Sequence, residues 1–349
     1  MPKAIALLSG GLDSTLAVLA LLEQKIDVTA VTFLTHFGCE ISDRSSCSHD
    51  PFPAAEKFGF TVKLCHLADK FIEIVKNPKH GHGKNMNPCV DCRILMLKEA
   101  KNLMRMTGAD FLVTGEVLGQ RPMSQRRDSF PLIDREAEVE GLVLRPLSAK
   151  LLRPTKAEIS GLVDRDKLYA FSGRTRKPQM ALAQRLGLTE YPAPAGGCLL
   201  TDPIYSFRLK DLLTHTPHPE ERALILLQYG RHFRLSEASK IIVGRNQLEN
   251  EEIVKTSRTG DYLFEVENYG SPVAILSGPM EQEVMRLASS ITARYSDAKH
   301  LPEIEVTIYR GFGNPVRVIT VPPAEDGILN QYRIEKKRTV KEDLIKFPE

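Results

Sequence analysis

Several features that would restrict the class of protein are missing from this 349-residue sequence. No apolar stretch approaches the roughly 18 residues of a membrane-spanning helix, which excludes a helical membrane protein. No signal peptide opens the chain, because an apolar run of strand type already begins at Lys3. The formal net charge is only +3, so composition permits a nucleic-acid partner without indicating one. We therefore expect a cytoplasmic protein that makes no membrane contact. The sequence indicates no oligomeric state.

Cysteine is also scarce, with six residues in the chain. In a reducing cytoplasm, thiols serve as buried groups, metal ligands or catalytic groups more often than as structural disulfides. The six are Cys39, Cys47, Cys65, Cys89, Cys92 and Cys198.

The pattern of apolar residues changes along the chain. Up to about residue 150, short apolar runs typical of strands alternate with helical stretches, which predicts an α/β fold with a doubly wound parallel sheet. After about residue 222 strands dominate, which predicts a smaller α+β domain. The expected segments are the α/β domain (1–150), a helical extension carrying Cys198 (151–205), a linker (206–221), the α+β domain (222–321) and a charged tail (322–349).

A pair of glycines, Gly10 and Gly11, lies between the apolar strings KAIALLS and LDSTLAVLALLEQ. Without a Cβ, the backbone can turn tightly and bring its N–H groups against an anion. The helix that follows directs the positive end of its dipole at the same place. No Gly-Lys-Ser/Thr follows, so this is not a Walker A loop. The turn predicts a phosphate site after the first strand, with a plain connecting turn as the alternative.

A second constellation is the string NPCVDC. Asn87 is suited to cap a helix and Pro88 to its first turn, which puts Cys89 and Cys92 one turn apart at a helix N-terminus, where thiolates are favoured. A zinc half-site, a redox pair, part of a cluster site and two buried cysteines all remain open. A third thiol, Cys198, follows two glycines in PAPAGGCLLTDP.

The string SGGLDS resembles the pyrophosphate loop, or PP-loop, of the N-type ATP pyrophosphatases, whose fold is adenine nucleotide alpha hydrolase-like. Members of that superfamily form AMP and pyrophosphate from ATP. The resemblance implies that ATP, with Mg²⁺, is held by Ser9, Gly10, Gly11, Leu12, Asp13 and Ser14.

Five strings in order, SGGLDS, NPCVDC, VTGEVLGQ, RPTKAEI and AGGCLLTDP, resemble the PP-loop tRNA thiouridine synthases over about residues 1–205. This resemblance implies an ATP-dependent tRNA uridine thiolase, which adenylates a uridine carbonyl oxygen and replaces it with sulfur. The same loop also serves small-molecule sulfurtransferases and ATP-dependent ligases, which are the alternative. Further nucleotide contacts are expected at Thr32, Gly115 and Lys156, and contacts with RNA phosphates or pyrophosphate at Arg174, Arg176 and Lys177.

The cysteines depart from one branch of this family. In bacterial 2-thiouridylases an Asp occupies the position of Cys89, whereas Cys92 and Cys198 match the two family cysteines. Three cysteines resemble the thiolases that hold a 4Fe–4S cluster by three thiolates and leave one iron open. The competing mechanism is a persulfide on Cys198 that Cys92 resolves as a disulfide. The cluster is favoured because the persulfide scheme leaves Cys89 unexplained. The sulfur donor would be sulfide or a persulfide carrier protein.

The string GRNQLEN and its flanking strands resemble the NFACT-R domain, an RNA-binding module, over about residues 222–321. The chain shows no N-terminal extension of the kind that carries RNA recognition in 4-thiouridine synthases, so this module is expected to bind tRNA instead. The alternative is a small domain that only packs on the enzyme. The resemblance implies RNA contacts at Arg231, Arg234, Arg245 and Asn246, with Lys240 beside them.

Overall fold

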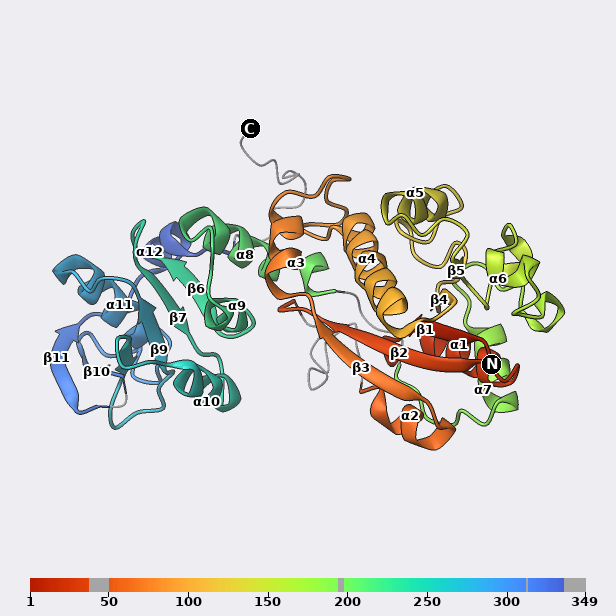
Figure 1. Ribbon diagram of the computed structural model, residues 1–349. Helices are drawn as coiled ribbons and strands as arrows, with labels where there is room; N and C mark the ends of the chain where they lie inside the picture. The colour runs from red at the N-terminus through yellow and green to blue at the C-terminus, as the bar shows by residue number, and fades with distance from the viewer. Residues whose placement is uncertain (38–49, 194–197, 312, 336–349) are drawn as a thin grey trace. The chain divides into compact units, whose positions relative to one another are not determined.

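The computed structural model describes residues 1–37, 50–193, 198–311 and 313–335. It divides into two compact units, Met1–Asp202 and Pro203–Glu349 (Figure 1). Within the described residues, no helix is long and apolar enough to cross a membrane.

Unit 1 is built on a parallel sheet with the strand order β3-β2-β1-β4-β5. The strands are β1 (Lys3–Leu7), β2 (Asp27–Leu34), β3 (Thr61–His66), β4 (Phe111–Thr114) and β5 (Val143–Leu144). Leu7 at the end of β1 pairs with Val31 on one side and with Thr114 on the other. The loops after β1 and β4 therefore leave the sheet side by side.

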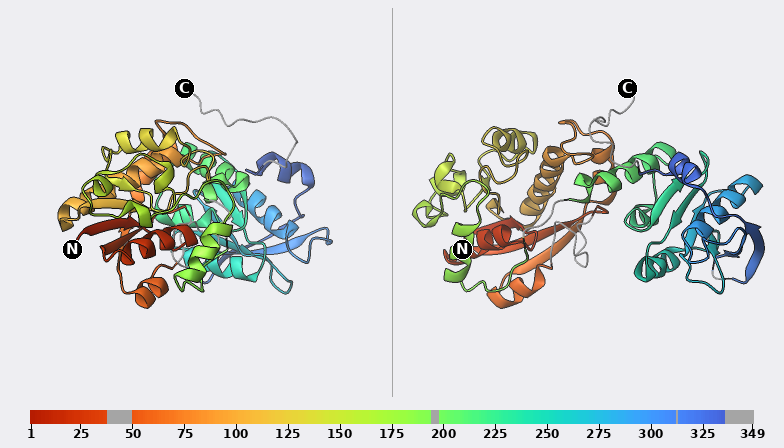
Figure 2. Two further views of the ribbon diagram at one scale, coloured as in Figure 1. Left: turned by 90° about the vertical axis from the view of Figure 1, so that its right-hand side faces the viewer. Right: turned by 180° about the vertical axis from the view of Figure 1, so that it is seen from behind.

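Helices cover both faces of this sheet (Figures 1 and 2). The helices of unit 1 are α1 (Leu12–Leu22), α2 (Phe52–Phe58), α3 (Ala68–Lys76), α4 (Cys89–Thr107), α5 (Ser129–Glu136), α6 (Lys156–Ile159) and α7 (Lys177–Arg185), and its 3₁₀ turns are η1 (Ala149–Leu151), η2 (Arg165–Lys167) and η3 (Leu199–Thr201). Ala4 and Ala6 of β1 pack with Ala17 of α1 and Ala55 of α2. Because side chains alternate along a strand, Ile5 and Leu7 face the other side. This architecture confirms the predicted α/β doubly wound sheet.

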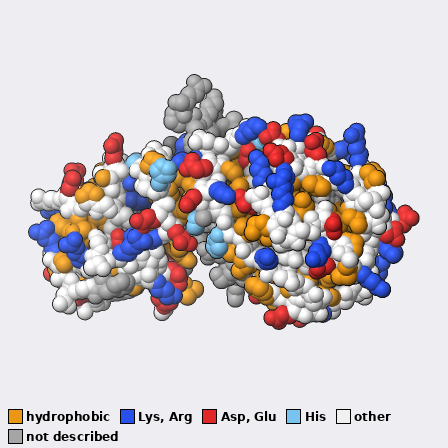
Figure 3. Space-filling model, viewed as in Figure 1, with side chains coloured by type: hydrophobic (Ala, Val, Ile, Leu, Met, Phe, Trp, Pro, Cys, Tyr) orange, Lys and Arg blue, Asp and Glu red, His pale blue; other side chains and the backbone are white. Residues whose placement is uncertain are grey.

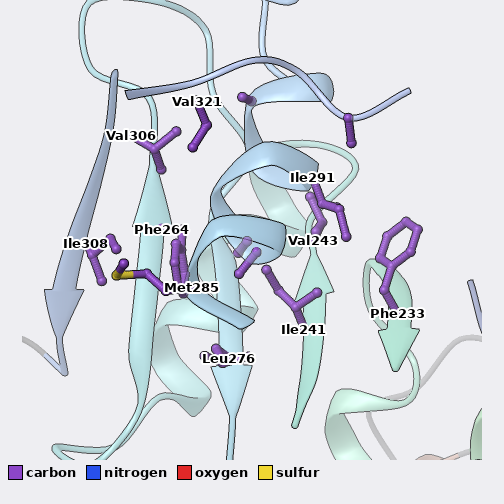
Figure 4. Packing of buried hydrophobic residues seen from close by; sticks show 14 of the residues in the cluster. Phe233, Ile241, Val243, Phe264, Leu276, Met285, Ile291, Val306, Ile308 and Val321 are labelled. Atoms are coloured by element: carbon purple, nitrogen blue, oxygen red, sulfur yellow. The ribbon is translucent and has the colours of Figure 1, made fainter. Parts of the chain in front are cut away.

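Unit 2 contains an antiparallel sheet of the order β11-β10-β8-β9-β7-β6. Its elements are α8 (Pro203–His215), α9 (Glu221–Leu226), β6 (Arg231–Arg234), β7 (Lys240–Val243), α10 (Gln247–Thr256), β8 (Tyr262–Glu265), β9 (Ala274–Ser277), α11 (Gln282–Arg294), β10 (Ile304–Arg310), β11 (Pro315–Val321) and α12 (Asp326–Tyr332). Met285 and Ile291 of α11 pack onto Phe264 and Leu276 of the sheet (Figure 4). A second cluster, which includes Ile253 of α10, fills the opposite face. The predicted α+β domain is therefore confirmed.

Two segments differ from the sequence expectation. The segment expected as a linker is largely helical, because α8 extends to His215 and buries Arg208, Leu209 and Leu212. Part of the expected charged tail forms α12, whose Leu329 joins the core of unit 2. Neither segment has the apolar run that would have marked it as buried; each helix buries only a few positions.

Candidate nucleotide and thiol site

The loop from Ser9 to Ser14 connects β1 to α1 and is held by its own hydrogen bonds. Gly10 has a φ of +69°, a conformation that glycine adopts readily. The Ser14 hydroxyl donates to Gly11 O at 3.0 Å and accepts from Ser9 N at 3.2 Å. Helix α1 follows Gly11 without a side-chain cap, so the positive end of its dipole is directed at the loop. The local geometry is that of an anion site.

Asp13 gives this loop a negative charge at a fixed position. Its Oδ2 atom accepts a hydrogen bond from Gln120 Nε2 at 2.9 Å. Its Oδ1 atom is buried and has no hydrogen-bond partner among the described residues. A buried carboxylate oxygen without a partner is costly to keep, which marks it as a candidate ligand for a cation.

Gly115, directly after β4, lies against the backbone of the same loop. A Cβ at this position would be 2.4 Å from Ser14 Cα and 2.6 Å from the carbonyl carbon of Asp13. Only glycine allows so close an approach. The sequence predicted a nucleotide contact at Gly115, and that role stays a prediction; the structure shows Gly115 packed against the backbone of the loop.

Helix α7 brings the expected basic loop to the same edge of the sheet. It packs on α1 through Leu182 and Ala183. Arg185, at its C-terminal end, pairs with Glu23 just after α1, so the two helices run in the same direction. Gly173 N donates to Leu118 O at 2.7 Å, which places the loop before α7 beside the segment that leads to Gln120.

The three basic residues of that loop differ in burial. Arg174 and Lys177 are exposed, whereas Arg176 is half-buried, with an Nε atom that has no partner in the described protein. Two further polar side chains were not singled out from the sequence. Gln179 is 1% exposed and both polar atoms of its amide lack a hydrogen-bond partner among the described residues. Gln125 is also buried, with its Oε1 unpartnered there. Only the tertiary fold reveals them.

Thr32 and Lys156 are placed less favourably for nucleotide contact. Thr32 is fully buried and donates its hydroxyl to Leu8 O at 2.9 Å. Lys156 lies 3.4 Å from where a Cβ of Gly141 would be, and Gly141 lies two residues before β5. That is the amino edge of the parallel sheet, opposite the edge that carries the Ser9–Ser14 loop. We therefore leave Lys156 out of the candidate ATP site.

Cys89 and Cys92 lie in the first turn of α4, as expected, and both are partly exposed. The loop before this turn is tied to the segment after Cys198. Asn85 Nδ2 donates to Thr201 O at 2.7 Å, and Met86 N donates to Leu200 O at 3.1 Å. Asn85 therefore ties the loop before α4 to the turn after Cys198, a role that no sequence motif had indicated.

Cys198 precedes η3 and is held there by Thr201, whose N and Oγ1 both donate to Cys198 O. Its Sγ lies 3.9 Å from Phe37 O. The fold thus brings the segments of all three cysteines into one region of unit 1. The two glycines before Cys198, together with Cys39 and Cys47, fall outside the described residues.

The described side chains do not form a ready metal site. Among residues 1–37, 50–193, 198–311 and 313–335, no group of three or more His, Cys, Asp or Glu residues is arranged to hold a metal ion. The expected cluster ligands Cys89, Cys92 and Cys198 therefore do not form a ready ligand set in this structure.

In unit 2, each residue expected to contact RNA already has a partner within the protein. Arg231 donates to Gly244 O and stacks over the Tyr295 ring at 4.4 Å, and Arg234 binds both oxygens of Asp211. Arg245 pairs with Glu249, and Asn246 caps α10 by accepting from Glu249 N at 3.0 Å. Lys240 is buried, 3.5 Å from Asp211.

The surface charge gives no stronger signal. On the face shown in Figure 3, Lys and Arg side chains are interspersed with Asp and Glu. RNA contacts by Arg231, Arg234, Arg245 and Asn246 therefore stay a prediction, and Arg245, whose side chain is 45% exposed, is the most accessible of the ion-paired residues among them.

Comparison with known families decides the assignment of unit 1. The family model described as "Thiamine biosynthesis protein (ThiI)" matches residues 1–177, which is half of the chain. The chain belongs to the ThiI family. A second model, "NFACT protein RNA binding domain", matches residues 230–333. Both matches confirm the resemblances expected from the sequence.

Relatives of this ThiI-family chain include the "tRNA-specific 2-thiouridylase MnmA" of Methylobacterium nodulans, 30% identical over 130 residues, or 34% of each chain. They also include a "Probable tRNA sulfurtransferase" of Thermococcus kodakarensis, 26% identical over 42% of this chain and 36% of the relative. The chain thus spans about a third of the length of these relatives.

Among solved structures, a 4-thiouridine synthetase–RNA complex with bound ATP covers 54% of the chain and 52% of its own, at 21% identity and a TM-score of 0.33. So low a TM-score supports no argument, and the fold rests on the strand order itself.

Proposed function

We propose that this ThiI-family protein is an ATP-dependent tRNA uridine thiolase. The observation that supports this most directly is the pair of hydrogen bonds from Asn85 and Met86 to Thr201 and Leu200. They join two cysteine-bearing segments, far apart in sequence, in the unit that also holds a phosphate loop. Relatives of unit 1 are named as tRNA thiolation enzymes, and a matched RNA-binding domain follows in unit 2.

In this proposal, the Ser9–Ser14 loop and the N-terminus of α1 bind the β- and γ-phosphates of ATP. Asp13 Oδ1, buried without a hydrogen-bond partner among the described residues, fits a Mg²⁺ ion that the phosphates also bind. The ion would neutralise charge on the departing pyrophosphate. Arg176, with its unpartnered Nε, lies at the same edge of the sheet and suits a further phosphate contact.

A uridine carbonyl oxygen then attacks the α-phosphorus and pyrophosphate leaves. Adenylation turns a poor leaving group into AMP. Sulfide can add directly to the activated carbon, and AMP departs to leave a thiocarbonyl. If the sulfur is instead the outer atom of a persulfide on Cys198, Cys92 attacks the remaining S–S bond, which releases the thiocarbonyl and leaves a Cys92–Cys198 disulfide. The role of Cys89, Cys92 and Cys198 is to hold or deliver that sulfur next to the activated base. Because the described residues form no ready metal ligand set, we route no step through an iron–sulfur cluster.

We propose further that unit 2 binds tRNA and that the enzyme works in the cytoplasm, where tRNA is modified. Arg234 and Arg245 are already paired with carboxylates. We therefore expect exposed groups near them to contribute to RNA binding as much as these two residues do.

The test is a thiolation assay under exclusion of oxygen. The protein receives ATP, Mg²⁺, sulfide and bulk tRNA, and thiolated nucleosides are measured by mass spectrometry. We expect 2- or 4-thiouridine, together with AMP and pyrophosphate. Cleavage of ATP without RNA, and no thiouridine, would support a small-molecule sulfurtransferase or ligase instead.

Single cysteine variants refine the result. Cys92→Ser and Cys198→Ser should each abolish thiouridine in both sulfur schemes, whereas Cys89→Ser should do so only in the cluster scheme. Cys65→Ser is the matched control: Cys65 lies on β3, where burial raises the pKa of its thiol and makes it a poor nucleophile. A parallel preparation with iron chelator separates the two sulfur schemes. Loss of activity would favour the cluster, and retained activity would favour a persulfide.

A further inference from the structure

A buried carboxylate, Glu116, connects the strand end beside the phosphate loop to the helix that carries Cys89 and Cys92. Glu116 directly follows Gly115, and its side chain is only 3% exposed. Its Oε2 accepts hydrogen bonds from Thr114 Oγ1 and from Arg145 Nε, both at 3.0 Å. Its Oε1 forms an ion pair with Arg93, 3.1 Å from Nε, although the two groups are not aligned for a hydrogen bond.

Arg145 holds this carboxylate in a fixed direction. Its side chain is 4% exposed and binds both oxygens of Asp134 on α5, at 2.9 and 2.7 Å. Its guanidinium also lies over the Phe130 ring, 4.1 Å from the centroid. This bidentate contact leaves Arg145 little freedom. Arg145 therefore holds Glu116 through Oε2, the oxygen that does not face Arg93.

Arg93 lies on the helix that carries Cys89 and Cys92. It follows Cys92 directly in the first turns of α4 and is 27% exposed. Arg93 and the two cysteines lie in the first turns of the same helix, so an ion pair at Arg93 helps to fix where these turns lie.

At its other end, Glu116 reaches the phosphate loop through one peptide bond. Gly115 lies so close to the backbone of Asp13 and Ser14 that no Cβ fits between them. A short path therefore runs from the ATP loop through Gly115, Glu116 and Arg93 to Cys92.

We infer that Glu116 is a positioning residue that sets the place of the cysteine turn relative to the activated nucleotide. This rests on the proposed thiolase function. The buried Glu116 carboxylate restricts where the Arg93 guanidinium can lie, because leaving a buried charge unpaired is costly. The pair should therefore matter for sulfur delivery and not for adenylation.

The test separates the two half-reactions in the full-length protein. Exchange of labelled pyrophosphate into ATP, in the presence of tRNA, reports adenylation alone, and thiouridine formation reports the complete reaction. Glu116→Gln keeps the shape and an acceptor for Thr114 and Arg145, but removes the charge that faces Arg93. We expect exchange within about twofold of wild type and thiouridine formation lower by roughly 10- to 100-fold, the cost of a misplacement near 1 Å.

Three further variants decide between positioning and general support. Arg93→Gln should reproduce the effect from a partly exposed position, where folding is not at risk, and Arg93→Lys should restore part of the activity. The double variant Glu116→Gln/Arg93→Gln should lose no more than either single one, because both remove one interaction. Glu138→Gln is the matched control: it removes the ion pair that Lys101, farther along α4, forms outside this network, and should leave both half-reactions unchanged.

Parallel loss of exchange and thiouridine in Glu116→Gln and Arg93→Gln would overturn the inference, as would no loss in either. Failure of the proposed function would show differently, because wild-type protein would then form no thiouridine at all.

Discussion

Replacing Gly115 by alanine tests how the end of β4 supports the phosphate loop. The added methyl group would lie 2.4 Å from Ser14 Cα and 2.5 Å from Ser14 N. All the nearest atoms are backbone, so no side chain can rotate away. The loop must retreat by about 1 Å to restore ordinary contact. A displacement of that size near reacting atoms costs up to about 100-fold in rate, or about 2.7 kcal/mol of transition-state stabilisation.

The assay is tRNA-dependent pyrophosphate exchange, with ATP affinity measured by equilibrium titration. We expect Gly115→Ala to weaken both. Gly260→Ala is the control, because no atom lies within 4 Å of the place where its methyl group would be. Gly11→Ala gives a second comparison within the loop: its nearest atom is Ser9 Oγ at 3.5 Å, so the fold should be unaffected. If pyrophosphate exchange and ATP affinity of Gly115→Ala equal those of wild type, the close approach of Gly115 to the loop does not matter for nucleotide binding or adenylation.

Three stability predictions follow from the buried charges and the helix cap. Arg145→Met should lower the free energy of unfolding by roughly 3–5 kcal/mol, because Glu116 and Asp134 lose their shared buried partner; a loss under about 1 kcal/mol in urea unfolding would contradict this. Burial lowers the pKa of Lys240 to about 8 from 10.5, so in that interval the unfolded chain binds the proton that the folded chain has released, and stability should rise with pH. Lys240→Met should remove this contribution, so the free energy of unfolding should rise less between pH 8 and 10.5 in the variant than in wild type. An equal rise in both proteins would refute it. Asn246→Ala should cost about 1 kcal/mol through loss of the α10 cap, and Asn246→Asp should not, as thermal unfolding can check.

The parts of the site that follow directly from strand ends could be predicted from the sequence. Gly10, Gly11 and Gly115 each come just after an apolar strand, and parallel strands place their carboxyl ends at one edge. The start of α4 at the cysteine turn was also predicted, although Pro88 and not Asn87 is the residue before the helix and no side chain caps it.

Residues whose role depends on distant partners were not predictable. Lys156 matches a family string, but the string does not state which edge of the sheet it occupies. Arg234 looks like an RNA contact until Asp211, 23 positions earlier, is seen to bind it through both oxygens. Arg145 had no local signal at all. A list of basic residues gives the charge of a segment, whereas the tertiary fold determines which of those charges are already neutralised.

The hydrogen bonds from Asn85 and Met86 to the turn after Cys198 also have a consequence for synthesis of the chain. The partners Asn85 and Thr201 are separated by 116 positions, whereas β1, the phosphate loop and α1 lie within the first 22 residues. On the ribosome, the strands that support the loop, β1, β2 and β4, have all emerged well before Thr201 does. The strands and the loop of the nucleotide site are therefore synthesised early, Arg176 follows later, and the thiols come together only when unit 1 is nearly complete. The three thiols thus come together after the strands and the phosphate loop of unit 1 have been synthesised.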